Sequence, residues 1–222
     1  MTVFKAPEYI QNLFNTIANK YDFMNDMMSF GLHKLIKKDC VKILDITPHS
    51  KVLDACTGTG DIAKLIKEYQ SLAEVIGIDF SDNMLDIARI KNKSIKFEFA
   101  DITNTNFPDN SFNFITIGFG LRNISNPEKA LAEIYRILKP GGKFLHLDFG
   151  KKNFISKIFN IFVPTIAKIF SKNHDAYSYL IKSKTAFPEP EELIKDFEKS
   201  GFNFVMRKDY IFGIISMQIM KK

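Results

Sequence analysis

Cysteine is scarce in this chain of 222 residues, which contains only Cys40 and Cys56. Two cysteines make neither a disulfide framework nor a zinc site, so we expect reduced thiols buried as small apolar side chains. The sequence also lacks an apolar run that is long and uncharged enough to span a bilayer, and we expect no signal peptide at its start. With an apolar fraction of 45%, these absences indicate a soluble protein of the cytoplasm.

Positively charged side chains are only modestly in excess, and the formal net charge is +6. Such a charge would suit nucleic acid or an anionic membrane surface, but it also serves plain solubility. Zinc-finger spacing, an RNA-binding aromatic signature and basic runs are all missing, so we expect no nucleic-acid partner. The sequence shows no cluster of metal-ligating residues either, and we expect no metal.

The stretch of residues 51–61 organises the chain. Two apolar residues start it as a buried strand, Gly58 and Gly60 then allow a tight turn, and apolar residues at helical spacing follow. Strand, glycine turn and helix open nucleotide-binding βαβ units, whose helix N-terminus offers free N–H groups to a ligand. A lone Gly-x-Gly pair is weak evidence, because many such pairs are plain turns.

Two acidic residues strengthen this interpretation. Asp79 ends the next predicted strand and lies 19 residues after Gly60 (79 − 60), the spacing at which a carboxylate meets ribose hydroxyls. Asp54 precedes Gly58 by four residues (58 − 54), where a dinucleotide-binding strand usually has no acid. An acid at that place suits a cationic cofactor, and a sulfonium compound is one.

From residue 51 to about residue 150, predicted strands and helices alternate. The expected strands span 51–55, 74–79, 95–100, 112–118 and 143–149. The expected helices span 60–70, 82–91 and 127–138, with Ser81 capping the second, Pro127 starting the third and Lys139-Pro140-Gly141-Gly142 closing it. Such alternation predicts a parallel sheet with right-handed crossovers, and ligands bind at the carboxyl ends of its strands. Gly58, Asp79 and Asp101 all lie there.

The flanking segments complete a single predicted domain. Residues 1–45 form an N-terminal helical cap, 46–150 the cofactor-binding core, 151–185 a helical insertion, and 186–222 a C-terminal helix with paired strands at 202–210 and 214–220. The cap is predicted from one apolar helical stripe, made of Ile10, Leu13, Phe14, Ile17, Ala18 and Tyr21. The methionines and aromatics that follow this stripe either line an apolar pocket or fill the core.

Residues 151–172 combine phenylalanine and isoleucine with five lysines and no acid. A basic amphipathic stretch predicts a lid or a helix on a membrane surface. A helix that simply packs on the core is an equally good interpretation.

Residues 115–124 join a predicted strand to the helix that starts at Pro127. They carry Gly118 and Gly120, followed by Arg122 and Asn123. A loop with an arginine at the carboxyl end of a strand is a candidate site. On spacing alone, a surface arginine in a turn is an equally good interpretation.

Together these pieces resemble the class I S-adenosylmethionine-dependent methyltransferases. Residues 99–102 resemble the end of that class's third strand, and residues 138–144 resemble the turn before its fifth. Within the class, the chain resembles the quinone C-methyltransferases, which methylate demethylmenaquinol and, in many bacteria, a ubiquinone precursor. The matching segments cover nearly the whole chain and are 18–22, 24–26, 28–31 with His33, 53–61, 119–123, 133–142 and 175–180. The most specific are Tyr-Asp-x-Met-Asn-Asp at 21–26 and Phe-Gly-Leu-Arg-Asn at 119–123.

The resemblance implies an α/β, Rossmann-like fold with a mostly parallel seven-stranded sheet flanked by helices, N-terminal helices and a helical insertion. It implies S-adenosyl-L-methionine as the cofactor. The cofactor-binding residues that it implies are Asp54, Gly58, Thr59, Gly60, Asp79, Phe80, Asp101, Ile102 and Gly118. Asp79 would take the ribose hydroxyls, and the strand end at Asp101 would contact the adenine.

The resemblance further implies transfer of a methyl group to a ring carbon of a prenylated hydroquinone, with demethylmenaquinol as the first choice. The implied catalytic residues are Arg122, which would stabilise the phenolate, and Tyr21, which with Asp22 would close over the cofactor. His33 and His146 are further candidates for a base, since no His–Asp pair is visible in the sequence. A substrate with a prenyl tail lives in the membrane, so we expect peripheral contact with the inner membrane face. A homodimer is compatible with the resemblance.

Several positions depart from the family pattern. Ile36 stands where a tryptophan is usual, Gly118 replaces a common serine, the insertion is shorter than usual, and a histidine expected near the C-terminal end is absent. Because of these departures, the methyl acceptor could instead be a ubiquinone-precursor benzoquinol or another small molecule. An NAD-binding Rossmann oxidoreductase and a non-catalytic scaffold are remoter alternatives. Gly-x-Gly-x-x-Ala at 58–63 fits the oxidoreductase, whereas Asp54 and Arg122 argue against it.

Overall fold

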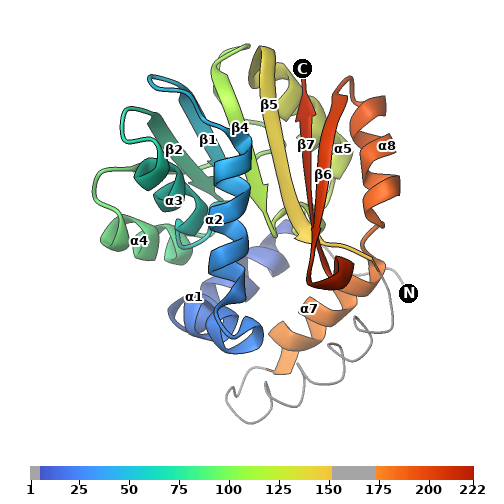
Figure 1. The fold of residues 1–222 in the computed structure, drawn as a ribbon. Helices are drawn as coiled ribbons and strands as arrows, with labels where there is room; N and C mark the ends of the chain where they lie inside the picture. The colour runs from blue at the N-terminus through green and yellow to red at the C-terminus, as the bar shows by residue number, and fades with distance from the viewer. Residues whose placement is uncertain (1–5, 152–173) are drawn as a thin grey trace.

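The computed structural model describes residues 6–151 and 174–222, and the strands within these ranges form one seven-stranded sheet (Figure 1). Their order across the sheet is β3-β2-β1-β4-β5-β7-β6. β7 runs antiparallel to β5 and β6, and every other pair of neighbours is parallel. The predicted mostly parallel sheet is therefore confirmed. The strands are β1 (Lys51–Ala55), β2 (Glu74–Asp79), β3 (Lys96–Phe99), β4 (Phe112–Gly118), β5 (Leu138–Phe149), β6 (Asn203–Tyr210) and β7 (Ile215–Lys221).

Helices cover both faces of the sheet. α2, α3 and α4 pack on the face turned to the viewer in Figure 1, and α5 and α8 pack on the far face. Because side chains alternate along a strand, Val52 enters the first layer and its neighbour Leu53 enters the second, and both are wholly buried. These helices are α2 (Leu32–Leu44), α3 (Asp61–Tyr69), α4 (Asp82–Lys91), α5 (Pro127–Ile137) and α8 (Pro190–Lys199).

Two further helices, α1 (Pro7–Ser29) and α7 (His174–Ala186), lie beyond the edge of the sheet where the parallel strands end (Figure 1). The predicted apolar stripe of α1 is buried against Met84 of α4 and Tyr179 of α7. These helices close over the carboxyl edge of the sheet, where ligands of such folds bind.

Residues 139–142 behave differently from the prediction. α5 ends at Ile137, and β5 begins directly at Leu138, which pairs with Phe112. The next pair in the register joins Phe114 to Lys143, so the four residues between bulge out of the strand. Proline cannot donate a ladder hydrogen bond and Gly141 has a left-handed φ of 78°, so this segment cannot continue the strand regularly.

Within the described ranges, no helix is long and apolar enough to cross a membrane. Except for Lys151, the amphipathic stretch predicted at 151–172 lies outside the described residues.

Candidate active site

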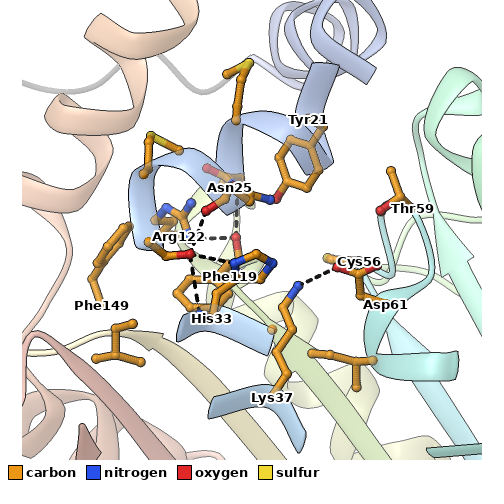
Figure 2. A pocket seen from close by; sticks show the side chains of 18 of the residues that line it. Tyr21, Asn25, His33, Lys37, Cys56, Thr59, Asp61, Phe119, Arg122 and Phe149 are labelled. Atoms are coloured by element: carbon orange, nitrogen blue, oxygen red, sulfur yellow. Dashed lines mark hydrogen bonds and ion pairs between the residues drawn. The ribbon is translucent and has the colours of Figure 1, made fainter. Parts of the chain in front are cut away.

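A cavity of about 550 Å³ opens where α1, α2 and α7 meet the carboxyl edge of the sheet (Figure 2). We call it the large cavity. A hollow of about 80 Å³ adjoins it over the ends of β2 and β3, and we call this the small hollow. The two share wall residues, which include Tyr21, Gly58, Gly118 and Phe119. The site therefore has two connected compartments.

The predicted cofactor residues divide between these compartments. Asp54 and Thr59 border the large cavity, Asp79, Phe80, Asp101 and Ile102 border the small hollow, and Gly58 and Gly118 border both. Gly60 borders neither.

Asp54 holds the glycine turn in place. Its buried carboxylate accepts hydrogen bonds from Thr57 Oγ1 (2.6 Å), Thr116 Oγ1 (2.7 Å) and the backbone N–H of Ala63 (3.1 Å). These bonds join the turn to β4 and α3. Burial raises the pKa of Asp54 to about 6, because the donors offset only part of the loss of water.

The two glycines of the turn, Gly58 and Gly60, have different structural roles. Gly58 has a left-handed φ of 56°, and a Cβ on it would point into open space, which leaves room for a ligand against the backbone. Gly60 also has a left-handed φ, at 82°, but it is the N-cap of α3. A Cβ on Gly60 would come within 2.9 Å of the Phe97 ring, so this glycine serves the packing behind the turn.

The small hollow contains two fixed carboxylates. Asp79 accepts the N–H of Gly58 on one oxygen (2.8 Å) and the N–H of Ser81 on the other (3.0 Å). Burial raises the pKa of Asp79, and these hydrogen bonds oppose the rise. Asp101 accepts the N–H of Thr103 (2.8 Å). Carboxylates oriented in this way present their remaining lone pairs to the hydroxyls or amines of a ligand.

A chain of ion pairs clamps α1 and α2 to the glycine turn. Lys91 Nζ of α4 lies 2.7 Å from Asp22 of α1 and 2.8 Å from Asp61. Lys37 Nζ of α2 lies 3.0 Å from Asp61, and Figure 2 shows this pair. Asp22 also accepts a hydrogen bond from Thr59 Oγ1 (2.6 Å). Burial opposes ionisation of Asp61, yet Lys37 and Lys91 hold its pKa well below its usual range. Sequence reasoning pointed to Asp22 and missed both lysines, which lie far from it along the chain.

Arg122 lies in the wall of the large cavity and is held by a buried ion pair that the sequence did not suggest. Its Nη1 donates to Asp148 Oδ1 (2.7 Å) and to the carbonyl of Phe119 (2.6 Å). The guanidinium carbon lies 5.0 Å from the centre of the Phe149 ring. Since Arg122 is only 5% exposed, its interpretation as a surface residue is wrong.

Tyr21, Gly118 and Cys56 form the junction of the two compartments. The ring of Tyr21 meets that of Phe14 edge to face, with centroids 6.3 Å apart. A Cβ on Gly118 would overlap Cδ1 of Ile62, so a serine there would require the end of the Ile62 side chain to move. Cys56 is half-buried in the wall, with a left-handed φ of 53°, so the expectation that both thiols are core residues holds for Cys40 alone. Burial raises the pKa of the Cys56 thiol well above its usual value.

Of the two histidines predicted as bases, the structure brings one to the cavity. His33 borders it from the first turn of α2, and its Nδ1 lies 2.7 Å from Ser29 Oγ. His146 lies on β5 with its Nδ1 2.7 Å from Gln218 Oε1, and it borders neither compartment. Burial lowers the pKa of both imidazoles.

The described residues fit the expected cofactor and offer no metal site. In residues 6–151 and 174–222, no group of three His, Cys, Asp or Glu side chains could hold a metal ion. The open face of Gly58 leaves space along the turn, and Asp79 offers acceptors for two hydroxyls. The ion pair of Lys37 and Asp61 borders the large cavity beside the turn, where it provides both signs of charge for an amino-acid head group.

Comparison with known proteins agrees with this fit. The chain matches the ubiE/COQ5 methyltransferase family over residues 1–222. Demethylmenaquinone methyltransferases of Bacillus cereus and Bacillus anthracis are 35% identical to it over 227 residues, covering 97% of this chain and 96% of each relative.

Solved structures show the same fold at low sequence identity. One is an S-adenosylmethionine-dependent methyltransferase from Thermotoga maritima, described as a possible histamine N-methyltransferase. It has a TM-score of 0.72 and 22% identity, covering 95% of this chain and 99% of that chain. Another is phosphoethanolamine N-methyltransferase 2 of Haemonchus contortus in complex with S-adenosyl-L-methionine, with a TM-score of 0.69 and 15% identity, covering 94% of this chain and 60% of that chain. The chain belongs to the ubiE/COQ5 methyltransferase family and is an S-adenosylmethionine-dependent methyltransferase.

Proposed function

We propose that this protein methylates a ring carbon of a prenylated hydroquinone, with demethylmenaquinol as the acceptor and menaquinol as the product. Relatives at 35% identity are named demethylmenaquinone methyltransferases. The observation that carries the proposal is the large cavity, which adjoins the small hollow and combines the charge of Arg122 with a mainly apolar wall. The apolar wall from α1 consists of Leu13, Phe14, Ile17, Met24 and Met28.

The polar end of the site suits the cofactor. S-adenosylmethionine supplies, when bound, a methyl group on a positively charged sulfur. Asp79 would accept the ribose hydroxyls, and Phe80 and Ile102 would contact the adenine. Asp54 places a carboxylate at the start of the turn, which favours a cation. Asp61, paired with Lys37, would meet the amino-acid part.

Arg122 would serve the acceptor. A guanidinium remains charged at every working pH, so it stabilises a phenolate oxygen without taking up or releasing a proton. Asp148 and the carbonyl of Phe119 fix its direction. A ring held between this group and the side chains of α1 would be ordered before the methyl transfer, which lowers the entropic part of the barrier.

Exposed apolar side chains lie in the wall of the large cavity or next to it in the chain, and we call them the apolar rim. Phe30, at 87% exposure, and Leu32 come from the elbow between α1 and α2. Ile211 and Phe212, the latter at 82%, come from the turn η2 (Ile211–Gly213) between β6 and β7. Phe30, Leu32 and Ile211 also line the cavity. Exposed apolar side chains beside a cavity support membrane contact, and we propose that the rim rests on the inner membrane face and admits the prenyl tail.

The double variant Phe30→Ser/Phe212→Ser tests the rim. It should co-sediment less with phosphatidylglycerol vesicles and turn over a long-tailed quinol more slowly, while sparing a short-tailed analogue. Phe204→Ser is the control, since Phe204 is exposed on β6 and pairs with Met220, at the far end of that strand from η2. Equal loss on both substrates, or unchanged vesicle binding, would refute the membrane role.

The acceptor itself is tested with purified protein, S-adenosylmethionine and chemically reduced acceptors. Mass spectrometry should find one added methyl group on demethylmenaquinol, with a higher kcat/KM than on a ubiquinone-precursor benzoquinol. Cells without the protein should accumulate demethylmenaquinone. Methylation of the benzoquinol alone would refute demethylmenaquinol as the acceptor and would assign the enzyme to the ubiquinone precursor.

A further inference from the structure

The elbow between α1 and α2 places a histidine in the wall of the large cavity. α1 ends at Ser29, Phe30 and Gly31 follow with left-handed φ values of 50° and 75°, and His33 lies in the first turn of α2. His33 is 6% exposed, and it borders the same cavity as Asn25 and Tyr21 (Figure 2). An acid–base side chain thus adjoins the space in which the acceptor ring would lie.

The hydrogen bonds of Ser29 decide which nitrogen of His33 carries the hydrogen. Ser29 Oγ lies 2.6 Å from the carbonyl oxygen of Asn25, which can only accept, so the hydroxyl hydrogen points to that carbonyl. Ser29 Oγ also lies 2.7 Å from His33 Nδ1, so this nitrogen must be the donor. The neutral imidazole therefore carries its hydrogen on Nδ1 and leaves Nε2 as a bare acceptor.

Asp26 lies near this bare nitrogen. Its Oδ1 is 3.7 Å from His33 Nε2, and both atoms are acceptors while the ring is neutral. Lys34 pairs with the same carboxylate, with its Nζ 2.7 Å from both Oδ1 and Oδ2, and donates its hydrogen bond to Oδ2. A proton on Nε2 would turn this contact into an ion pair, so Asp26 favours the protonated ring.

The other surroundings keep the ring neutral at rest. Burial lowers the pKa of His33, and Lys37 and Lys34 of α2 lower it further. Asp26 of α1 and Asp61 of α3 act in the opposite direction. The net result is a pKa below the usual value of 6.5, so the imidazole is unprotonated at neutral pH and able to accept a proton.

Three charged groups of the wall are poorly suited to that task. Arg122 does not give up its proton in proteins. Asp54 is occupied by three hydrogen bonds, and Lys37 is paired with Asp61.

Building on the proposed function, we infer that His33 is the general base of the reaction. Its Nε2 takes the proton of a ring hydroxyl, so an O–H bond breaks and an N–H bond forms. The ring carbon then bonds to the methyl group while the sulfur–methyl bond breaks, and the sulfur keeps the electron pair. The hydrogen of that ring carbon then leaves as a proton to water, which restores the aromatic ring as a phenolate. The imidazolium returns its proton to the phenolate oxygen, so the hydroquinone and the neutral base are regenerated. Ser29 acts as a positioning residue that fixes the tautomer, and Asp26 stabilises the imidazolium.

The first test replaces His33 by glutamine and measures turnover of demethylmenaquinol at pH 7.5. We expect kcat to fall about 10²–10⁴-fold, the usual contribution of a general base. The affinity for S-adenosylmethionine, measured by calorimetry, should stay within about twofold, because no cofactor group depends on this ring. His49→Gln is the matched control, since His49 is exposed in the loop before β1 and borders neither compartment. It should keep the kcat of the wild type.

The pH profile gives a second readout that a packing role would not move. In the wild type, kcat should rise tenfold per pH unit up to the pKa of His33 and then level off. His33→Gln should lack this limb and recover rate only as the pH approaches the ionisation of a phenol, about 10. Asp26→Asn should move the limb to lower pH, because the imidazolium loses its carboxylate. Ser29→Ala should lower kcat without changing cofactor affinity.

The possible results distinguish a failure of the proposed function from a failure of the role assigned to His33. A wild-type enzyme that does not methylate demethylmenaquinol would overturn the proposed function. Normal methylation with an unchanged kcat and acid limb in His33→Gln would overturn the role of His33 alone. A loss of kcat matched by an equal loss of cofactor affinity would assign His33 to the structure and would also overturn the inference.

Discussion

The two compartments of the active site are built in opposite ways. Around the glycine turn and the small hollow, the carboxylates of Asp54, Asp79 and Asp101 lie at or just after the ends of the neighbouring strands β1, β2 and β3. Each is tied to neighbouring hydroxyl or N–H groups. The far wall of the large cavity comes from segments scattered along the chain, with α7 packed against η1 (Leu121–Asn123). Buried polar atoms without a hydrogen-bond partner among the described residues gather there: Arg122 Nε, Asn123 Oδ1 and Tyr179 Oη belong to residues of the wall, and Asp148 Oδ2 lies behind it, on the partner of Arg122.

This difference separates two ways of binding. Carboxylates that already accept hydrogen bonds from the protein keep a fixed orientation. They bind a ligand through their remaining lone pairs, which suits a site that always takes the same cofactor. Unsatisfied buried groups gain energy from a ligand that supplies the missing partner, so they select among acceptors. Variants of the two walls should therefore fail differently.

The largest effect is expected at the buried ion pair of the acceptor wall. Arg122→Ala leaves the carboxylate of Asp148 buried and unpaired, which should lower the free energy of unfolding by about 3–5 kcal/mol. Urea denaturation measures this loss. The double variant Arg122→Met/Asp148→Leu should regain much of it and bind the cofactor normally, yet remain inactive on the quinol. An active double variant would show that the arginine only supports the fold.

The next effect concerns the cofactor wall. Asp79→Ala removes charge-assisted hydrogen bonds, each worth about 1.5–3 kcal/mol, so affinity for S-adenosylmethionine should fall about tenfold or more. Calorimetry is the measurement, and Asp86→Ala, an exposed acid of α4, is the control. Unchanged affinity in Asp79→Ala would remove this residue from the cofactor site.

A smaller effect should appear when the pH is lowered. The pKa of Asp54 is about 6, so the carboxylate gains a proton as the pH falls below that value and loses its attraction for a cation. S-adenosylmethionine carries a positive sulfur and S-adenosylhomocysteine does not, although both share every other group. The ratio of their affinities should therefore fall severalfold between pH 7.5 and pH 5. A constant ratio would limit Asp54 to holding the turn.

The smallest effect is expected at the ion pairs that hold α1 and α2 to the glycine turn. Asp22 is partly exposed, so its pair with Lys91 is screened by water, and Asp22→Asn should cost about 0.5–1 kcal/mol. Cofactor affinity should weaken by a few-fold, and hydrogen exchange in α1 should accelerate. Exchange rates that stay unchanged would show that Thr59 and the apolar stripe hold α1 without this carboxylate.

The same contrast explains what the sequence could predict. The glycine turn, the strand ends at Asp79 and Asp101 and the cap at Ser81 are local patterns, and the structure places each of these elements where expected. Asp148 escaped notice because its partner, Arg122, lies 26 residues earlier on a neighbouring loop, and one chain offers no signal for that pairing. The tautomer of His33 depends on a hydroxyl whose own partner is a backbone carbonyl, which no residue pattern encodes.

The bulge at residues 139–142 also lay beyond local reasoning. Lysine, proline and two glycines end helices in many proteins, and here α5 does end just before them. Only the pairing of Leu138 with Phe112 reveals that the strand has already begun. Pairing across strands is a property of the sheet and cannot be read from one segment.

The position of α1 between the two compartments bears on the turnover rate of the enzyme. Its side chains Phe14 and Tyr21 belong to the walls of both compartments, and Asp22, one residue on, bonds to Thr59 of the glycine turn. A movement of this helix away from the turn therefore uncovers both compartments in a single event. The spent cofactor and the methylated quinol would then leave through the same opening, and the dwell time of α1 in its seated position would set an upper limit on the number of turnovers per second.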